Sequence, residues 1–181
     1  MSIRIEDGNG KGYLAGVTSA NKIRTYSTVE FEAAYESEEN GNCYSWSASY
    51  SYGAGDTVLL LKNDDVSKNL LIDRIVLAGS ASTQVVIHSP SVTTPTGTAV
   101  TGVNVNRGSG KLSATTAIQD ETTNTQANVL MRAFVGASAS SLVLTPYGSI
   151  VVPYNGCIAI DYMTSGICYA TIIGYYRKSE F

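Results

Sequence analysis

The residues that could carry out chemistry in this 181-residue chain are few and scattered. His88 is the only histidine, and no cysteine or carboxylate stands at metal-ligand spacing from it. The serines lie in no G-x-S-x-G elbow, and the glycines at 8, 10 and 12 are followed by no Walker lysine pattern. Asp161 lies in an apolar β segment, which suggests partial burial. The sequence therefore predicts a protein that is not an enzyme, with no catalytic, metal-binding or cofactor-binding site.

Three cysteines, Cys43, Cys157 and Cys168, are an odd number that fits poorly with a secreted disulfide framework. Cys157 and Cys168 could approach each other across a C-terminal hairpin. A turn at 164–165, however, would place Cys168 opposite Asp161. We therefore expect three buried thiols and no disulfide bond between Cys157 and Cys168.

The segment from 43 to 52, CYSWSASYSY, has the cleanest alternation in the chain. Successive side chains of a β-strand face opposite sides, so the segment predicts one aromatic face and one serine face. The aromatic face consists of Tyr44, Trp46, Tyr50 and Tyr52, with Ala48 between them. These side chains either cover the core while the serines face water, or form an exposed platform that binds a glycan or a protein. The sequence leaves both interpretations open.

Short apolar segments bounded by Gly, Pro or Asn recur along the rest of the chain. They predict strands at 58–61, 70–77, 83–89 and 128–135 and in four further segments between 140 and 178. Asp64 and Asp65 lie in the polar turn between the first two of these strands. The threonine-rich stretch 90–128 predicts surface loops with short β pieces. A total of roughly eight or nine body strands, without a sustained helical period, predicts an all-β protein with a jelly-roll-like β-sandwich body.

The first 31 residues combine closely spaced glycines with alternating apolar residues. Such dense glycines oppose helices and long strands, and the apolar content is too high for a solvated linker. We interpret the segment as an extended amino-terminal arm whose apolar side chains bind another protein. The expected contacts are Ile3, Ile5, Tyr13, Val17, Ile23 and Tyr26. An acidic stretch with at most a turn or two of helix follows, so we assign residues 1–37 to the arm and an acidic hinge, and 38–181 to the body.

Charged residues make up 15% of the chain, against about 25% in typical globular proteins. The net charge of −3 argues against a nucleic-acid-binding surface, which is usually basic. No secretory signal is visible at the start, and no apolar stretch approaches the ~18 residues of a membrane span. We expect a soluble protein made in a cytoplasm, with no nucleic-acid partner and no membrane partner.

The beginning of the chain also resembles a known family. A D-G-x-G-x-G motif at 7–12 is followed by Val17, Ser19, Asn21, Lys22, Ile23 and Thr25. This pattern resembles the amino-terminal segment of tailed-phage virion proteins of the head-fibre, capsid-decoration and related minor structural classes. Looser matches occur at 55–65, 70–77, 96–111 and 172–178, so the resemblance touches most of the chain.

The resemblance implies a non-enzymatic virion structural protein, attached to the phage capsid as a decoration, cement or head-fibre component. Its partners would be the major capsid protein or other virion proteins, reached by strand addition of the arm. It would also bind further copies of itself, in a homo-oligomer for which the resemblance implies a trimer. The protein would be located in the virion after assembly in the host cytoplasm. Two alternatives remain: a neck or tail structural protein, and a glycan-binding β-sandwich module.

Overall fold

The computed structural model divides the chain into two compact units, Met1–Phe31 and Glu32–Phe181. The structure describes residues 32–91, 94–121, 124–137 and 141–178, and the backbone of 16–17 and 23–24. In the first unit, β1 (Gly16–Val17) pairs antiparallel with β2 (Ile23–Arg24), so Val17 lies opposite Ile23. The other predicted arm contacts, Ile3, Ile5, Tyr13 and Tyr26, lie outside the described residues. The docking role of the arm stays a prediction.

The second unit contains two six-stranded antiparallel sheets, named here after a central strand of each. The β13 sheet has the order β10-β6-β13-β4-β9-β7. Its strands are β4 (Thr57–Asn63), β6 (Thr83–His88), β7 (Thr98–Ala99), β9 (Thr115–Gln119), β10 (Val129–Val135) and β13 (Cys157–Tyr162). The β14 sheet has the order β11-β5-β14-β3-β8, and β12 also pairs with β5. Its strands are β3 (Cys43–Tyr52), β5 (Lys68–Gly79), β8 (Val103–Asn104), β11 (Leu142–Leu144), β12 (Ile150–Val152) and β14 (Gly166–Lys178).

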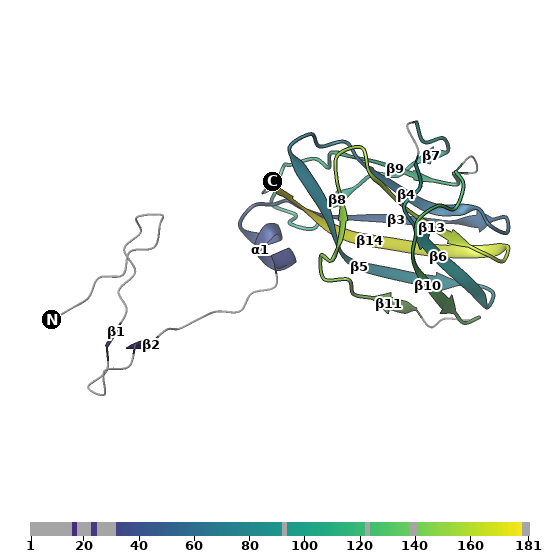
Figure 1. The fold of residues 1–181 in the computed structure, drawn as a ribbon, viewed down its shortest axis with the longest axis horizontal. Helices are drawn as coiled ribbons and strands as arrows, with labels where there is room; N and C mark the ends of the chain where they lie inside the picture. Colours follow the sequence, from purple (N-terminus) through teal and green to yellow (C-terminus); the bar gives the residue numbers. More distant parts are fainter. Residues whose placement is uncertain are drawn as a thin grey trace. The chain divides into compact units, whose positions relative to one another are not determined.

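Along the chain, the long strands alternate between the two sheets. β3 and β5 lie in the β14 sheet, and β4 and β6 lie in the β13 sheet. The later strands alternate in the same way: β10 and β13 lie in the β13 sheet, and β11 and β14 lie in the β14 sheet. Strands that are neighbours within a sheet therefore come from distant parts of the chain, as β14 does between β3 and β5 (Figure 1). This strand order is that of a jelly roll. The predicted all-β sandwich body is confirmed.

The core lies between the sheets and follows the two-residue period of the strands. Leu59 and Leu61 of β4 meet Ile158 and Ile160 of β13 in it, and none of these side chains is exposed. β13 is buried on both faces, and β4 is buried on both faces except at half-buried Lys62. Burying one such side chain stabilises the fold by about 1.5–3 kcal/mol. The apolar runs that mark these strands in the sequence are thus explained by their central place in the β13 sheet.

The C-terminal hairpin considered in the sequence analysis does not form. β13 pairs with β4 and β6, whereas β14 pairs with β3 and β5 in the other sheet. Cys168 therefore lies opposite Tyr50 and Gly79, and its expected place opposite Asp161 is wrong. The connection at 163–165 crosses between the layers, which the sequence of a short polar turn does not reveal. All three cysteines are buried thiols, as predicted.

Helix α1 (Glu32–Glu38) occupies the acidic stretch, where at most two helical turns were predicted. No other helix occurs in the described part of the chain, and α1 is too short to cross a bilayer. β9 was not predicted, because its five residues, TTAIQ, include only two buried apolar side chains, Ala117 and Ile118. Such a short stretch shows no recognisable period.

The turn between β4 and β5 contains Asp64 and Asp65, as predicted. Asp65 Oδ1 accepts hydrogen bonds of 2.8 Å from the backbone N–H and from the hydroxyl of Ser67, which is the local bonding expected of aspartate in a turn. Asp64 bonds outside the turn: its Oδ2 accepts the Thr116 N–H at 3.0 Å and the Thr116 hydroxyl at 2.6 Å. Its Oδ1 lies 3.0 Å from Lys62 Nζ. Asp64 thereby ties the turn to β9.

Candidate functional site

The predicted aromatic face of β3 is mostly part of the core. Tyr44, Trp46 and Tyr52 are 2%, 0% and 3% exposed, and the Tyr44 ring packs edge-on against Tyr176 with centroids 5.6 Å apart. Only Tyr50, at the open end of the strand, is exposed, at 54%. The four rings therefore form no common surface that could grip a glycan, and the core interpretation of this strand holds. The serines of β3 face outward, as that interpretation requires.

A buried polar cluster lies on the outer face of the β13 sheet, the face turned away from the core. Thr57 Oγ1 donates to Asp161 Oδ1 at 2.6 Å, and His88 Nε2 lies 2.9 Å from Asp161 Oδ2. The His88 and Asp161 side chains are 0% and 1% exposed. They come together because His88 pairs with Ala159 while Asp161 pairs with Val86, which makes them diagonal neighbours on one face.

Residues 124–128, together with Glu121, cover this cluster and bond to it. The Ala127 N–H donates to His88 Nδ1 at 3.4 Å, and Asn124 Nδ2 donates to Thr57 Oγ1 at 2.5 Å. The Glu121 carboxylate accepts the Asn124 N–H at 2.8 Å and the Thr96 hydroxyl at 3.0 Å. The loop and the strand ends thus share one hydrogen-bond network. His88 Nδ1 accepts the Ala127 N–H, whereas Nε2 lies 2.9 Å from Asp161 Oδ2 without a hydrogen bond of good geometry. The network therefore fastens the loop to the strands.

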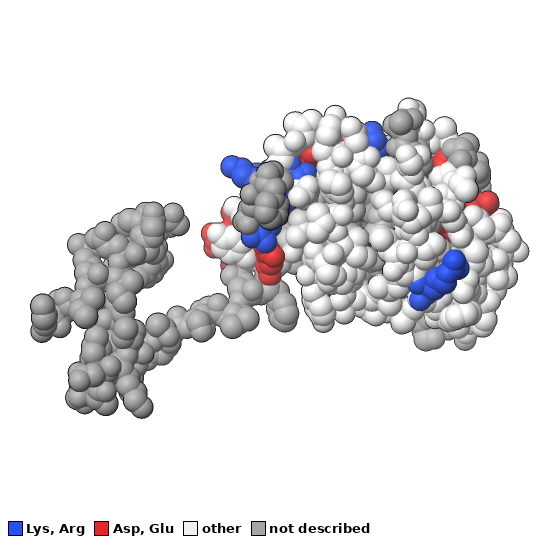
Figure 2. Space-filling model, viewed as in Figure 1, with Lys and Arg blue, Asp and Glu red and all other residues white. Residues whose placement is uncertain are grey.

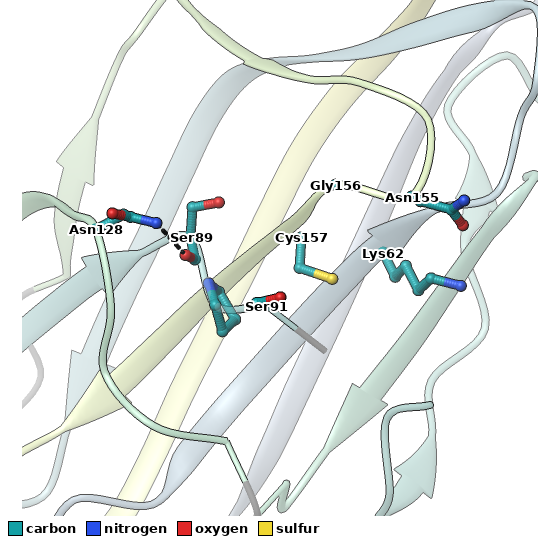
Figure 3. A pocket seen from close by; sticks show the side chains of 8 residues that line it. Lys62, Ser89, Ser91, Asn128, Asn155, Gly156 and Cys157 are labelled. Atoms are coloured by element: carbon teal, nitrogen blue, oxygen red, sulfur yellow. Dashed lines mark hydrogen bonds between the residues drawn. The ribbon is translucent and has the colours of Figure 1, made fainter. Parts of the chain in front are cut away.

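A hollow of about 540 Å³ opens on the same outer face (Figure 3). Its lining consists of Lys62, Ser89, Pro90, Ser91, Asn128, Asn155, Gly156 and Cys157. Asn128 Nδ2 donates to the Ser89 carbonyl at 3.5 Å across one side of it, and Cys157 lies between that side and Lys62 (Figure 3). The Lys62 ammonium is held by Asp64. The hollow offers amide and hydroxyl groups for weak polar binding and brings no base next to a nucleophile.

Helix α1 is fixed to the β14 sheet at its first residue. Arg177 Nη1 lies 2.5 Å from Glu32 Oε1, and the Tyr175 hydroxyl donates to Glu32 Oε2 at 3.2 Å. Burial and the neighbouring Glu32 carboxylate raise the pKa of Tyr175 to about 12, so its hydroxyl remains a donor at neutral pH. Glu32 is the residue at which the amino-terminal segment enters the body.

The other end of α1 is held by the loop at 104–111. Asn106 Nδ2 donates to the Ser37 carbonyl at 2.9 Å, and Lys111 Nζ donates to the Asn40 carbonyl at 2.5 Å. A cation at this position also complements the negative end of the helix dipole. Gly41 turns the chain with φ +57°, and a side chain there would meet Ser109 Oγ at 2.5 Å. The sequence analysis missed this anchor, since nothing in the polar stretch 104–111 points to a helix 70 residues earlier.

Charged side chains are distributed unevenly over the body. On the side seen in Figure 2, acidic and basic residues gather around α1 and the rim, and most of the middle is uncharged. Among the described residues, no group of three or more His, Cys, Asp or Glu side chains is arranged to hold a metal ion. No protein-family model matches this chain, and neither the curated proteins nor the solved structures include a match.

Proposed function

We propose that this protein is a non-enzymatic structural component of a phage virion, attached to the capsid as a decoration, cement or head-fibre protein. In this proposal residues 1–31 bind neighbouring capsid subunits and the jelly-roll body projects from the contact. The chain also associates with further copies of itself. The resemblance of the first 31 residues to virion proteins supports this function, and the resemblance alone implies a trimer.

The observation that carries the proposal is the double anchorage of α1. An arm that binds a neighbour transmits force to its own body only if its root is fixed there. Glu32 is tied to Arg177 and Tyr175, and the last helical turn is tied to Asn106 and Lys111. One ion pair and one hydrogen bond at the first end, and two hydrogen bonds at the other, therefore hold the segment that follows the arm. This arrangement suits an attachment device.

The separate hydrophobic core of the body supports the same function. Its core is closed by the strands of the second unit, and the described core residues lie between Tyr44 and Tyr176. A body with its own core can be carried by an arm without depending on it for stability. The glycan-binding alternative has lost its main support, because Tyr44, Trp46 and Tyr52 are buried.

A binding assay on particles that lack this protein tests the proposal. We expect the full chain to decorate such particles and a variant without residues 1–31 to remain unbound, with a melting temperature within a few degrees of the full chain. Electron microscopy of the decorated particle should place the added density on the head. Density on the neck or tail would favour the alternative location.

A matched pair of arm variants sharpens the assay. Ile3→Ser/Ile5→Ser removes two predicted contacts, whereas Ser2→Ala/Ser27→Ala changes two small polar positions of the same arm. We expect only the isoleucine variant to lose binding. Undiminished binding of the truncated chain would overturn attachment through the arm, and unfolding on truncation would make the arm an integral part of the body.

A further inference from the structure

The outer face of the β14 sheet is unusually apolar for a surface. Six outward side chains on three adjacent strands define an outer apolar patch: Val76 and Ala78 of β5, Val143 of β11, and Ile167, Tyr169 and Ile173 of β14. They are neighbours by register, because Val143 pairs with Val76, Val76 with Thr171, and Ala78 with Tyr169. Val143 and Tyr169 are each 49% exposed and Ile167 is 46% exposed.

The neighbouring strand β3 shows what a solvated face of this sheet looks like. Its outward positions opposite the patch are Ser47, Ser49 and Ser51, all exposed. An antiparallel sheet with one wet face normally alternates apolar inward and polar outward residues. β3 obeys this rule, and β5, β11 and β14 break it at the outer apolar patch. Val76, Ala78 and Ile173 are half-buried and the other three patch residues are exposed. Contiguous apolar surface of this kind marks interaction sites.

The charge of the patch indicates its partner. Arg74, which pairs with Ile173, is exposed at its border, and Asp73 precedes it in the same strand, so the two charges balance. Binding a strongly charged partner would remove water from the charges of that partner, and the patch offers no opposite charges in return. Such desolvation costs free energy. An uncharged apolar face fits better, and every copy of this chain carries one. We propose that the outer apolar patch binds the same patch on a second copy, across a two-fold axis near Thr171.

The size of the patch sets the strength of this contact. Three strands about 4.8 Å apart, over seven residues rising about 3.3 Å each, cover on the order of 300 Å² of flat area. A standard interface buries about 800 Å² on each partner. Side-chain relief adds to the flat area, but the contact stays at the small end. The association is therefore weak and reversible. The dimer becomes populated only at high local concentration, for example where attachment to a particle brings many bodies together. The inference rests on the self-association included in the proposed function, but it gives a two-fold contact between two bodies where the resemblance implies a trimer.

Sedimentation velocity of the full chain over a range of concentrations tests the contact. We expect monomer at low concentration and dimer at high concentration. Tyr169→Glu places a charge in the patch and should weaken the association at least tenfold. Phe134→Glu is the matched control, because Phe134 is 75% exposed on β10 of the other sheet. A chain that stays monomeric throughout, or equal effects of the two variants, would overturn the inference. A trimer unaffected by Tyr169→Glu would overturn it too, while leaving self-association intact.

A cross-linking experiment separates a second body from the other possible occupant, the amino-terminal arm. Thr171→Cys puts a thiol near the proposed axis, and the three native cysteines are buried. Under mild oxidation we expect a disulfide-linked dimer through Cys at this position and none from the control Phe134→Cys. If Tyr169→Glu breaks the dimer but Thr171→Cys does not cross-link, the patch-to-patch arrangement is wrong and the arm covers the patch.

Discussion

The two outer faces of the sandwich differ in which side chains they bury and which they expose. The outer face of the β13 sheet carries His88 and Asp161, yet both are buried because residues 124–128 cover them. The outer face of the β14 sheet carries Val143 and Tyr169, yet both are half exposed. Polar side chains are thus buried on the outer face of the β13 sheet, and apolar side chains are exposed on the outer face of the β14 sheet.

The difference follows from what each kind of group requires. A buried carboxylate or imidazole is tolerated only where hydrogen bonds replace water. Here Thr57 donates to Asp161, and the Ala127 N–H donates to His88, within the same molecule. An apolar side chain needs no specific partner, only cover, and a second molecule can provide it. The covered face therefore contributes to the stability of the monomer, and in our proposal the open face contributes to association.

Removing the carboxylate from the covered face should have the largest effect. Asp161→Ala removes the acceptor of the buried Thr57 hydroxyl and the carboxylate that lies 2.9 Å from buried His88 Nε2, so we expect the free energy of unfolding to fall by about 3 kcal/mol. Urea denaturation monitored by tryptophan fluorescence measures this. A loss below about 1 kcal/mol would mean that water replaces the carboxylate and that the face is less closed than the hydrogen bonds indicate.

Asp64, at the rim of the covered face, should make the stability of the fold depend on pH. We expect this effect to be smaller than that of Asp161→Ala. Burial alone would raise the pKa of Asp64, but hydrogen bonds from Thr116 and Lys62 lower it overall. Its stabilising contribution is therefore present above the unfolded-state pKa of about 3.9 and is lost as pH falls through the lower folded-state value.

Asp64→Asn should thus cost about 0.5–1 kcal/mol at pH 7, a discounted value because the side chain is partly exposed. Denaturation between pH 7 and pH 2.5 should show the variant and the natural chain converging in acid. The control Glu38→Gln, on the exposed side of α1, should run parallel to the natural chain throughout. A constant gap at all pH values would contradict the role of the Asp64 charge.

The open face should tolerate polar substitution in the monomer. Tyr169→Ser removes a half-exposed ring, and we expect the free energy of unfolding at low protein concentration to change by less than about 1 kcal/mol. The comparison between the faces fails if this change equals that of Asp161→Ala. In that case Tyr169 would stabilise the body itself, and its exposure would not mark an interface.

The thiols should show no covalent change at all. Reduction of the native protein is expected to leave its mass unaltered, since all three cysteines are thiols. Burial raises the pKa of Cys43 and of Cys168 to about 11, so alkylation at pH 8 should be slow until the chain unfolds. A gain of two hydrogens on reduction would reveal a disulfide and refute this expectation.

The local pattern of the sequence determined the elements of the body. The alternation of aromatic residues and serine in 43–52 places Tyr44 and Trp46 inward, and the long apolar runs mark β4, β5, β13 and β14. These assignments succeed because side-chain alternation is a property of each strand by itself. The same information cannot say which sheet a strand joins, and the expected hairpin of β13 and β14 was wrong for that reason.

Only the tertiary structure decided which distant residues meet. His88 and Asp161 are 73 positions apart, and they touch because β6 and β13 pair in one particular register. Glu32 reaches Arg177 because β14 brings the end of the chain beside α1. The outer apolar patch likewise arises where β11, β5 and β14 lie side by side, although each strand alone reads as ordinary core. Strand pairing is set by the packing of the whole sandwich, so the covered and open faces exist only once the chain has folded.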